Sequence, residues 1–554
     1  MTYWLKLPAE IRCIILKSVS QDYRFSEDKY SRAGYASVCR EWQGVFEPWN
    51  FRRLILDQDR IFGLKDYMSK RTTAHRREYT THIMLRIRLE EYDCSVCQSK
   101  EDNNTIHLND LTFSRAIWQL LAILSRWPAF TGRERLQTFG AGLTLELGAY
   151  SASDSEHTFR DFRLKPSYPI QSPRDIDDSY TSYCLHDQSQ ETLDDPTHGW
   201  VDGHQAHFAQ ILEGAKKRLT GTLTLKYDLP EFPSQRRKLP AVKIITGLLI
   251  RRQFYRQISA QSLGKLLSQA CSNLEWFRYE KWDDTNHPAT HFYHRIQDDP
   301  MQRILQNLPS TFRKLSLFED FNSIINPKRQ SDWYTCPCFA ESLAQSSRSL
   351  ESLSASFIVD AEYFFSEFTL SQVDVSTVPK WENLKTVALT SSILIPANNH
   401  SSKGDLLQAA GIAAASMPKL EIMELWNGDK GISCIFRYIN NVEGHGISWE
   451  SSFYIETPFC PETLSYWTGL QRHPQYGNCD FTVTVTKVKR DIQDINSHAY
   501  TISNLKLKDL VLDSFSYYEL FWEGNNREIR NIFNTERRKG AEENGEINTV
   551  VQSI

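Results

Sequence analysis

Long apolar runs are missing from this sequence of 554 residues. No stretch of roughly 18 consecutive apolar residues is present, so we expect no transmembrane helix. The opening residues, MTYWLKLPAEIR, lack the apolar core that a secretory signal requires. These two absences predict a protein that acts in the cytoplasm, the nucleus or both, without a membrane as its partner.

An excess of charge of either sign is missing as well. The chain has 64 Lys and Arg residues against 68 Asp and Glu residues, which gives a formal net charge of −4. This near-balance does not indicate nucleic acid or an anionic membrane surface as a partner. The 11 cysteines form no regular framework, which is typical of reduced thiols in the cytosol or nucleus.

The common catalytic signatures are also lacking. The sequence has no GxxxxGK[ST] phosphate loop, no GxSxG nucleophile elbow and no HExxH motif. Two carboxylate pairs, Asp177/Asp178 and Asp194/Asp195, lie in a polar stretch. Solvation there would keep the two pKa values of each pair similar, whereas a general acid and base need environments that separate them. We therefore expect no catalytic site.

The candidate metal ligands do not form a complete set. Cys94 and Cys97 make one CxxC, but a structural zinc needs four ligands, and His107 is the only further candidate nearby. We expect no metal and no cofactor. Three more histidines share a polar region and are expected to be solvated: His198, His204 and His207.

The N-terminus contains two amphipathic segments. From Pro8 to Val19 apolar residues recur at helical spacing, and Pro8 suits the first turn of a helix. The polar stretch that follows, ending at Gly34, predicts a loop. A second apolar stripe begins at Tyr35, and Pro48 is expected to end it. Periodicity alone favours a pair of helices that caps the domain that follows.

The residues of these segments resemble an F-box. Leu7–Ile11 reads LPAEI and Ser37–Trp42 reads SVCREW, two motifs of that family in the right order and at the right distance. The resemblance implies a docking module that binds the Skp-type adaptor of SCF ubiquitin ligases and, through it, a cullin scaffold. Trp42 would pack inside the module. The residues implied to face the adaptor are Leu7, Pro8, Ile11, Ile15 and Val38.

A short phrase of the form LxxLxL recurs downstream. Its clear copies begin at Leu274, Phe312, Leu350, Leu384 and Leu420, in steps of 38, 38, 34 and 36 residues, and most follow a helical stretch. This pattern resembles an irregular leucine-rich repeat, a curved parallel solenoid, although that repeat usually has roughly 20–29 residues. A late copy, LKDLVL, begins at Leu507. The alternative is an ordinary α/β domain whose strands share the phrase.

Residues between the apolar positions of a repeat strand would face outward. Trp276, Arg278, Phe318 and Trp426 occupy such positions. Large aromatic residues and arginine dominate the energetics of many protein interfaces. We therefore predict that these four side chains help to form a surface that binds a target protein.

Together these observations predict an α/β protein in three parts. Residues 1–50 form the F-box, residues 51–522 the irregular repeat domain with a polar, acidic insert at 150–205, and residues 523–554 a charged tail. The arrangement resembles the F-box proteins of filamentous fungi, which implies a non-catalytic, substrate-recognition subunit of an SCF-type ubiquitin ligase. Two alternatives stay open: a scaffold that binds the adaptor without directing ubiquitination, and an enzyme with an unrecognised site.

Overall fold

The computed structural model describes most of the chain, in the ranges that close this paragraph. The chain divides into two compact units, Met1–Leu315 with Glu319–Arg329 and Ser316–Phe318 with Gln330–Ile554. The boundary falls within the region predicted as one repeat domain. The described residues are 4–21, 31–70, 72–128, 142–159, 195–198, 200–201, 204–205, 209–229, 231, 238–282, 305, 308–320, 337–368, 380–395, 400–453, 459–477, 479–488 and 494–521.

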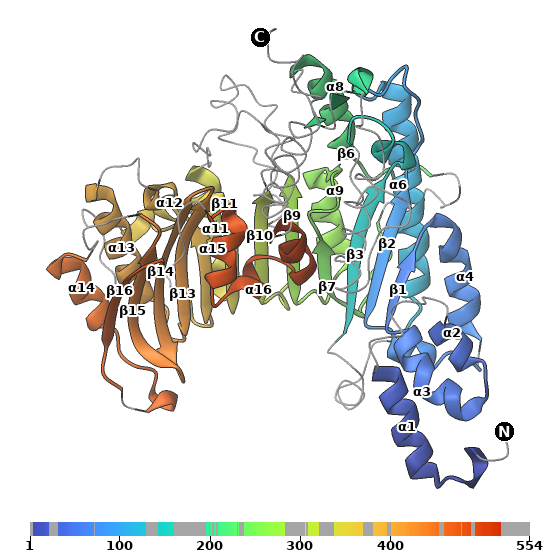
Figure 1. The fold of residues 1–554 in the computed structure, drawn as a ribbon, viewed down its shortest axis with the longest axis horizontal. Helices are drawn as coiled ribbons and strands as arrows, with labels where there is room; N and C mark the ends of the chain where they lie inside the picture. The colour runs from blue at the N-terminus through green and yellow to red at the C-terminus, as the bar shows by residue number, and fades with distance from the viewer. Residues whose placement is uncertain are drawn as a thin grey trace, which may run out of the picture. The chain divides into compact units, whose positions relative to one another are not determined.

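The predicted α/β class is confirmed, because the main feature is a mostly parallel sheet with helices (Figure 1). Its strands follow the order β1-β2-β3-β7-β9-β10-β11-β12-β13-β14-β15-β16. Antiparallel pairing joins β13 to β14 and β14 to β15. The bounds are β1 Arg53–Leu56, β2 His82–Arg88, β3 Leu143–Tyr150, β7 Ile245–Ile250, β9 Trp276–Trp282, β10 Lys314–Asp320, β11 Ser352–Asp360, β12 Thr386–Thr390, β13 Ile422–Asp429, β14 Ile432–Asn441, β15 Gly444–Ser451 and β16 Thr482–Lys487.

The first unit begins with helices and continues with parallel strands. β2 lies between β1 and β3 in parallel register, and β3 continues to β7. Helix α6 packs on β2 and on α4. The bounds are α1 Ala9–Gln21, α2 Ser31–Ala36, α3 Arg40–Asn50, α4 Gln58–Ser69, α5 Arg76–Tyr79, α6 Asn103–Leu124, α8 Ala209–Leu219, α9 Ala260–Lys265, β4 Trp200–Val201, β5 His204–Gln205, β6 Thr222–Leu223 and β8 Gln257–Ile258.

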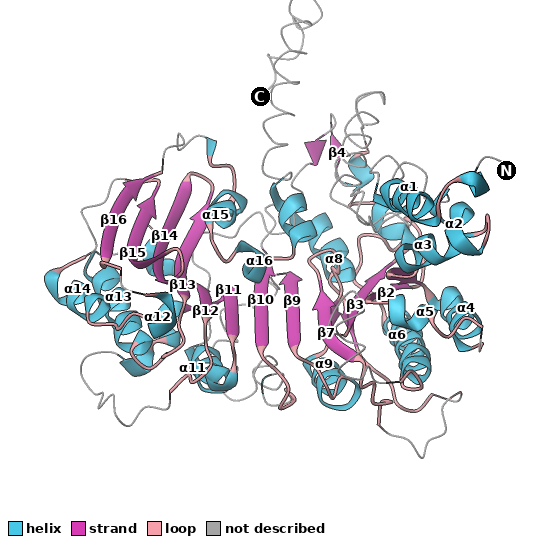
Figure 2. Cartoon of the chain, turned by 90° about the horizontal axis from the view of Figure 1, so that it is seen from below, coloured by secondary structure: helices cyan, strands magenta, loops and turns pink. Residues whose placement is uncertain are grey.

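In the second unit, strands β11 to β13 are buried on both faces, whereas every residue of β16 is exposed. Figure 2 shows α11 and α13 on one face and α15 and α16 on the other. Parallel strands are generally buried in this way, because crossover helices lie against the sheet. The bounds are α11 Pro337–Ser346, α12 Ala361–Phe364, α13 His400–Ala414, α14 Pro461–Thr468, α15 His498–Asn504 and α16 Lys508–Val511.

The five clear LxxLxL phrases form strands β9 to β13, as predicted. All fifteen apolar phrase positions are buried. Helices α9, α11 and α13 precede β9, β11 and β13. The late copy is different: after Leu507 the chain forms helix α16, so the prediction of a strand there is wrong. Its apolar residues pack on a sheet face instead of joining the sheet.

Three local predictions are corrected or left aside. The predicted loop before Gly34 contains α2, and α3 continues past Pro48 to Asn50. Parts of the predicted insert 150–205 have regular structure, and the rest of it lies outside the described residues. The predicted tail 523–554 also lies outside them. Within the described part of the chain, no helix combines the length and apolarity needed to cross a bilayer.

Candidate functional site

The N-terminal helices expose a group of apolar side chains. Ile11 and Ile15 are four residues apart in α1, so they share one helical face, and Leu7 lies in the bend just before this helix. Pro8 is exposed beside them. All five residues that the F-box resemblance implies for adaptor binding are therefore accessible. The exposed fractions of the large apolar side chains in this region are Leu7 36%, Ile11 43%, Ile14 61%, Ile15 37% and Val38 56%.

Trp42 has a different role from these exposed residues, as the sequence predicted. Its ring lies 5.9 Å from that of Trp4, 5.5 Å from that of Tyr35 and 5.7 Å from that of Phe46, measured between centroids. Phe46 is buried. Trp42 therefore connects the segment before α1 with α2 and α3, and the helical unit has a small aromatic core of its own.

An ion pair joins α1 to α3 beside this core. Glu41 of the SVCREW motif accepts hydrogen bonds from Arg12 Nε at 2.8 Å and from Trp4 Nε1 at 3.2 Å. The hydrogen bond from Arg12 is the main cause that lowers the pKa of the Glu41 carboxyl below its usual value. Arg12, which also donates to the backbone carbonyl of Leu7, thus links the SVCREW motif to the segment that carries LPAEI.

The predicted target-binding residues do not form one exposed surface. Trp276 and Arg278 are half-buried on β9. Phe318 and Trp426 each expose 0% of their surface, so the prediction that these two side chains face outward is wrong. They cannot contribute to a target-binding surface in this structure.

An aromatic cluster explains the burial of both residues. The Phe357 ring lies edge-on to the Phe318 and Trp426 rings, with centroids 5.8 Å and 5.1 Å away. His498 of α15 lies 5.4 Å from Phe357 and 6.0 Å from Phe318. Helix α15 therefore packs on the strand face that a repeat would leave open, and no local sequence pattern in β10 or β13 predicts this cover.

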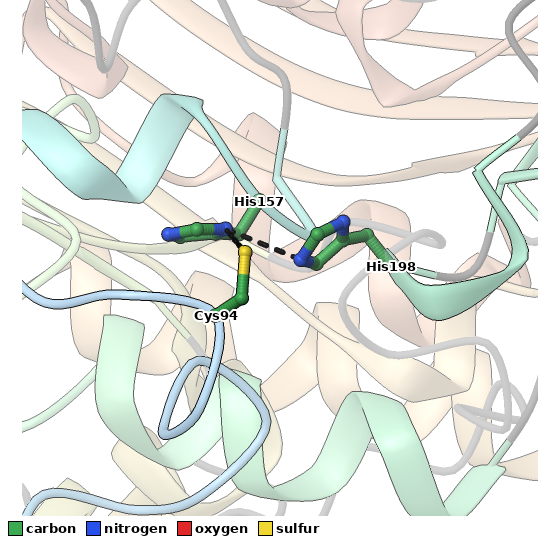
Figure 3. A group of neighbouring side chains, drawn as sticks. All are labelled: Cys94, His157 and His198. Carbon is green, nitrogen blue, oxygen red and sulfur yellow. Dashed lines mark hydrogen bonds between the residues drawn. The ribbon is translucent and has the colours of Figure 1, made fainter.

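Three candidate metal ligands from separate segments meet in the first unit. Cys94 follows β2, and His157 follows β3 and the short 3₁₀ helix Ala152–Ser155. Because β2 and β3 are parallel neighbours, the residues after both strands lie at the same edge of the sheet. His198 comes from the 3₁₀ helix Pro196–His198. The ligand atoms of Cys94, His157 and His198 all lie within 4.8 Å of one another (Figure 3).

The sequence missed this grouping for an identifiable reason. Cys94 belongs to the CxxC and His198 to a separate group of histidines, and His157 belongs to neither. His107 is exposed on α6 and Cys97 is buried, and neither belongs to the cluster. His207 and the pair Asp177/Asp178 lie outside the described residues. The available signal was that Cys94 and His157 both follow apolar strand segments at short distance.

A buried carboxylate forms a second charged group in this unit. Glu146 on β3 contacts His82 at 2.6 Å, Arg53 at 3.3 Å and Arg251 at 3.5 Å, beside a small pocket. Burial by itself raises the pKa of the Glu146 carboxyl, but the charges and hydrogen bonds of these neighbours outweigh burial and lower it to about 2. A carboxylate that stays ionised cannot donate a proton as a general acid near neutral pH. The arrangement is that of a structural ion-pair network.

Comparison with known proteins gives one match. A family of unknown function (DUF6546) matches residues 307–513, less than half of the chain. The match begins before β10 and ends just after α16, so it includes strands β10 to β16 and helices α15 and α16 but not β9. No curated protein and no solved structure matches the chain.

Proposed function

We propose that the chain is the substrate-recognition subunit of an SCF-type E3 ubiquitin ligase. Helices α1 to α3 dock the Skp-type adaptor, which links the complex to a cullin scaffold, and the rest of the chain binds a target protein. Such a receptor makes and breaks no covalent bonds. It raises the concentration of the target near the ubiquitin-carrying enzyme. The proposed location is the cytoplasm, the nucleus or both.

The exposure of the motif residues carries the proposal. The aromatic core of the helical unit does not explain why Leu7, Ile11 and Ile15 lie at its surface. Full burial of an aliphatic side chain is worth roughly 1.5–3 kcal/mol, and a partner that covers the exposed 36–43% of these side chains would recover the corresponding fraction. Grouped apolar side chains at a surface are typical of a protein-binding site. These residues are also the ones that the F-box resemblance assigns to the adaptor.

We propose fewer target-binding residues than the sequence predicted. Trp276 and Arg278 remain candidates, since both are partly accessible on β9. The Trp276 indole lies against Gly247 of β7, where an added Cβ would collide with the ring. Gly247 therefore leaves room for an indole that keeps one part exposed.

Co-purification with a Skp-type adaptor tests the docking role. We expect the full chain to capture the adaptor, and the double variant Leu7→Ala/Pro8→Ala to bind at least roughly 30-fold more weakly, as expected for the loss of about 2 kcal/mol at a central contact. The matched control is Phe62→Ala/Tyr67→Ala on α4, which removes two side chains that are each 65% exposed but lie outside the motif.

Two outcomes would contradict the docking role. The first is a folded wild-type chain that captures no adaptor. The second is equal binding by the wild type and the Leu7→Ala/Pro8→Ala variant. Either result would leave α1 to α3 as a helical cap. If the adaptor binds, target turnover that depends on this chain separates a receptor from a scaffold that directs no ubiquitination.

A further inference from the structure

The structure assigns a second site to this chain: we propose that Cys94, His157 and His198 bind one divalent transition-metal ion of the zinc class. This site is independent of the proposed docking unit, because none of the three residues belongs to α1, α2 or α3.

The outer nitrogens of both imidazoles carry protons. Nε2 of His157 lies 3.4 Å from the backbone carbonyl oxygen of Tyr92, which can only accept a hydrogen bond. Nδ1 of His198 lies 2.6 Å from a carboxylate oxygen of Asp195, which also accepts. In the tautomers that these two contacts favour, the inner nitrogens, His157 Nδ1 and His198 Nε2, direct their lone pairs toward each other (Figure 3).

Two lone pairs facing each other at close range need a cation between them. The inner nitrogens are 3.2 Å apart, and His157 Nδ1 lies 3.5 Å from Cys94 Sγ. A tetrahedral zinc with bonds of about 2.05 Å to nitrogen and about 2.3 Å to sulfur separates two nitrogens by about 3.3 Å and nitrogen from sulfur by about 3.6 Å. Both observed distances are close to these values.

The outer contact of His198 matches a known feature of metal sites. Metal-binding histidines usually donate their other ring N–H to a carboxylate or a backbone carbonyl, which fixes the ring and makes the ligand more basic. Asp195 provides the carboxylate for His198, and Tyr92 provides the carbonyl for His157. Both histidines expose only 7% of their surface, so neither is a solvated loop residue.

The surrounding loops hold the ligands in place. The Tyr92 ring stacks on His157 at 5.4 Å between centroids, and its hydroxyl donates to Asp154 at 3.0 Å. Asp154 also closes the capping box at Ser151. The guanidinium of Arg218 on α8 lies over the Tyr92 ring, 4.7 Å from its centroid. Rigid support of this kind is what a preorganised site requires.

Cys97 is not a ligand, although the CxxC spacing suggests one. Its thiol is 2% exposed and donates to the carbonyl of Cys94 at 3.3 Å. Burial raises the pKa of the Cys97 thiol, and Cys94 raises it further. Because Cys94 is exposed, the fourth coordination position is accessible to water. The proposed site thus has three protein ligands and one solvent ligand.

Cobalt titration of the full, tag-free chain tests the proposal. The chain is stripped of metal with EDTA, kept reduced and titrated with Co²⁺. We expect one equivalent to give a thiolate-to-cobalt charge-transfer band and the strong visible bands of a tetrahedral ion, and we expect Zn²⁺ to displace it. Cys94→Ser should abolish the charge-transfer band, and His157→Ala and His198→Ala should abolish stoichiometric binding. Asp195→Asn should weaken binding about 10- to 100-fold.

Matched controls separate this site from incidental thiol binding. Cys97→Ser removes the other cysteine of the CxxC, and Cys479→Ser removes an exposed cysteine elsewhere; both should keep the wild-type spectrum and affinity. Absence of a stoichiometric cobalt complex in the folded wild type would overturn the proposal and leave a proton between the two imidazoles. A band that survives Cys94→Ser but is lost in Cys97→Ser would overturn the assignment of ligands.

Discussion

The N-terminal helices expose large apolar side chains, whereas β10 and β13 bury theirs. In α1 and the turn before α3, Ile14 and Val38 remain 61% and 56% exposed. In β10 and β13, Phe318 and Trp426 are completely buried, although sequence logic placed them at a surface. A short helical unit has too little neighbouring chain to cover its apolar face. A strand in a parallel sheet receives cover from segments that are distant in sequence.

The largest expected effect is in the buried region. Trp426→Ala should lower the free energy of unfolding by about 3–5 kcal/mol, because it leaves a cavity beside Phe357. Urea unfolding of the full chain, followed by circular dichroism, measures this change. The comparison variant is Trp276→Ala on β9, where the half-buried indole predicts a smaller loss. A Trp426 variant as stable as the wild type would show that this side chain is exposed after all.

The next largest effect on stability is expected at the buried carboxylate of Glu146. The pKa of Glu146 is lowered to about 2 in the folded chain, so its charge stabilises the fold fully above its unfolded value near ~4.5, and this contribution is lost as the pH falls from there toward 2. The size is on the order of 3 kcal/mol. Glu146→Gln should therefore be clearly less stable than the wild type at pH 7, and this difference should shrink in acid.

The exposed ion pair of the N-terminal helices provides the control for Glu146. Arg12 and Glu41 remain partly accessible to water, which screens their attraction. Glu41→Gln should leave the unfolding midpoint of the chain nearly unchanged at pH 7. Equal losses from Glu41→Gln and Glu146→Gln would contradict the burial difference on which the comparison depends.

The smallest effect is expected at the most exposed isoleucine. Ile14→Ala should change the free energy of unfolding by less than ~0.5 kcal/mol, because the side chain contacts little and alanine favours a helix. Thermal melting of the full chain gives this measurement. A loss of several kcal/mol would mean that Ile14 is covered by another part of the chain, and the proposed docking surface would be smaller.

Local patterns predicted elements better than they predicted surroundings. The spacing of Ile11, Ile14 and Ile15 predicted α1, and five LxxLxL phrases predicted β9 to β13. The phrase at Leu507 failed because its residues are helical and cover a sheet face. Strand β7, with all six residues buried, was missed because it does not carry the phrase. The group of metal-ligand candidates was also not predicted, because His157 is 63 residues from Cys94 in the sequence.

The sequence by itself determined the α/β class, the apolar stripes of the first helices and the strand positions of the phrase, because periodicity is a local property. Only the tertiary structure decided which faces are covered. Helices α15 and α16 pack on β11, β13 and β14, and the parallel pairing of β2 with β3 brings Cys94 to His157. The physical reason is that burial and ligand geometry depend on contacts between distant segments, and no window of the sequence contains both partners.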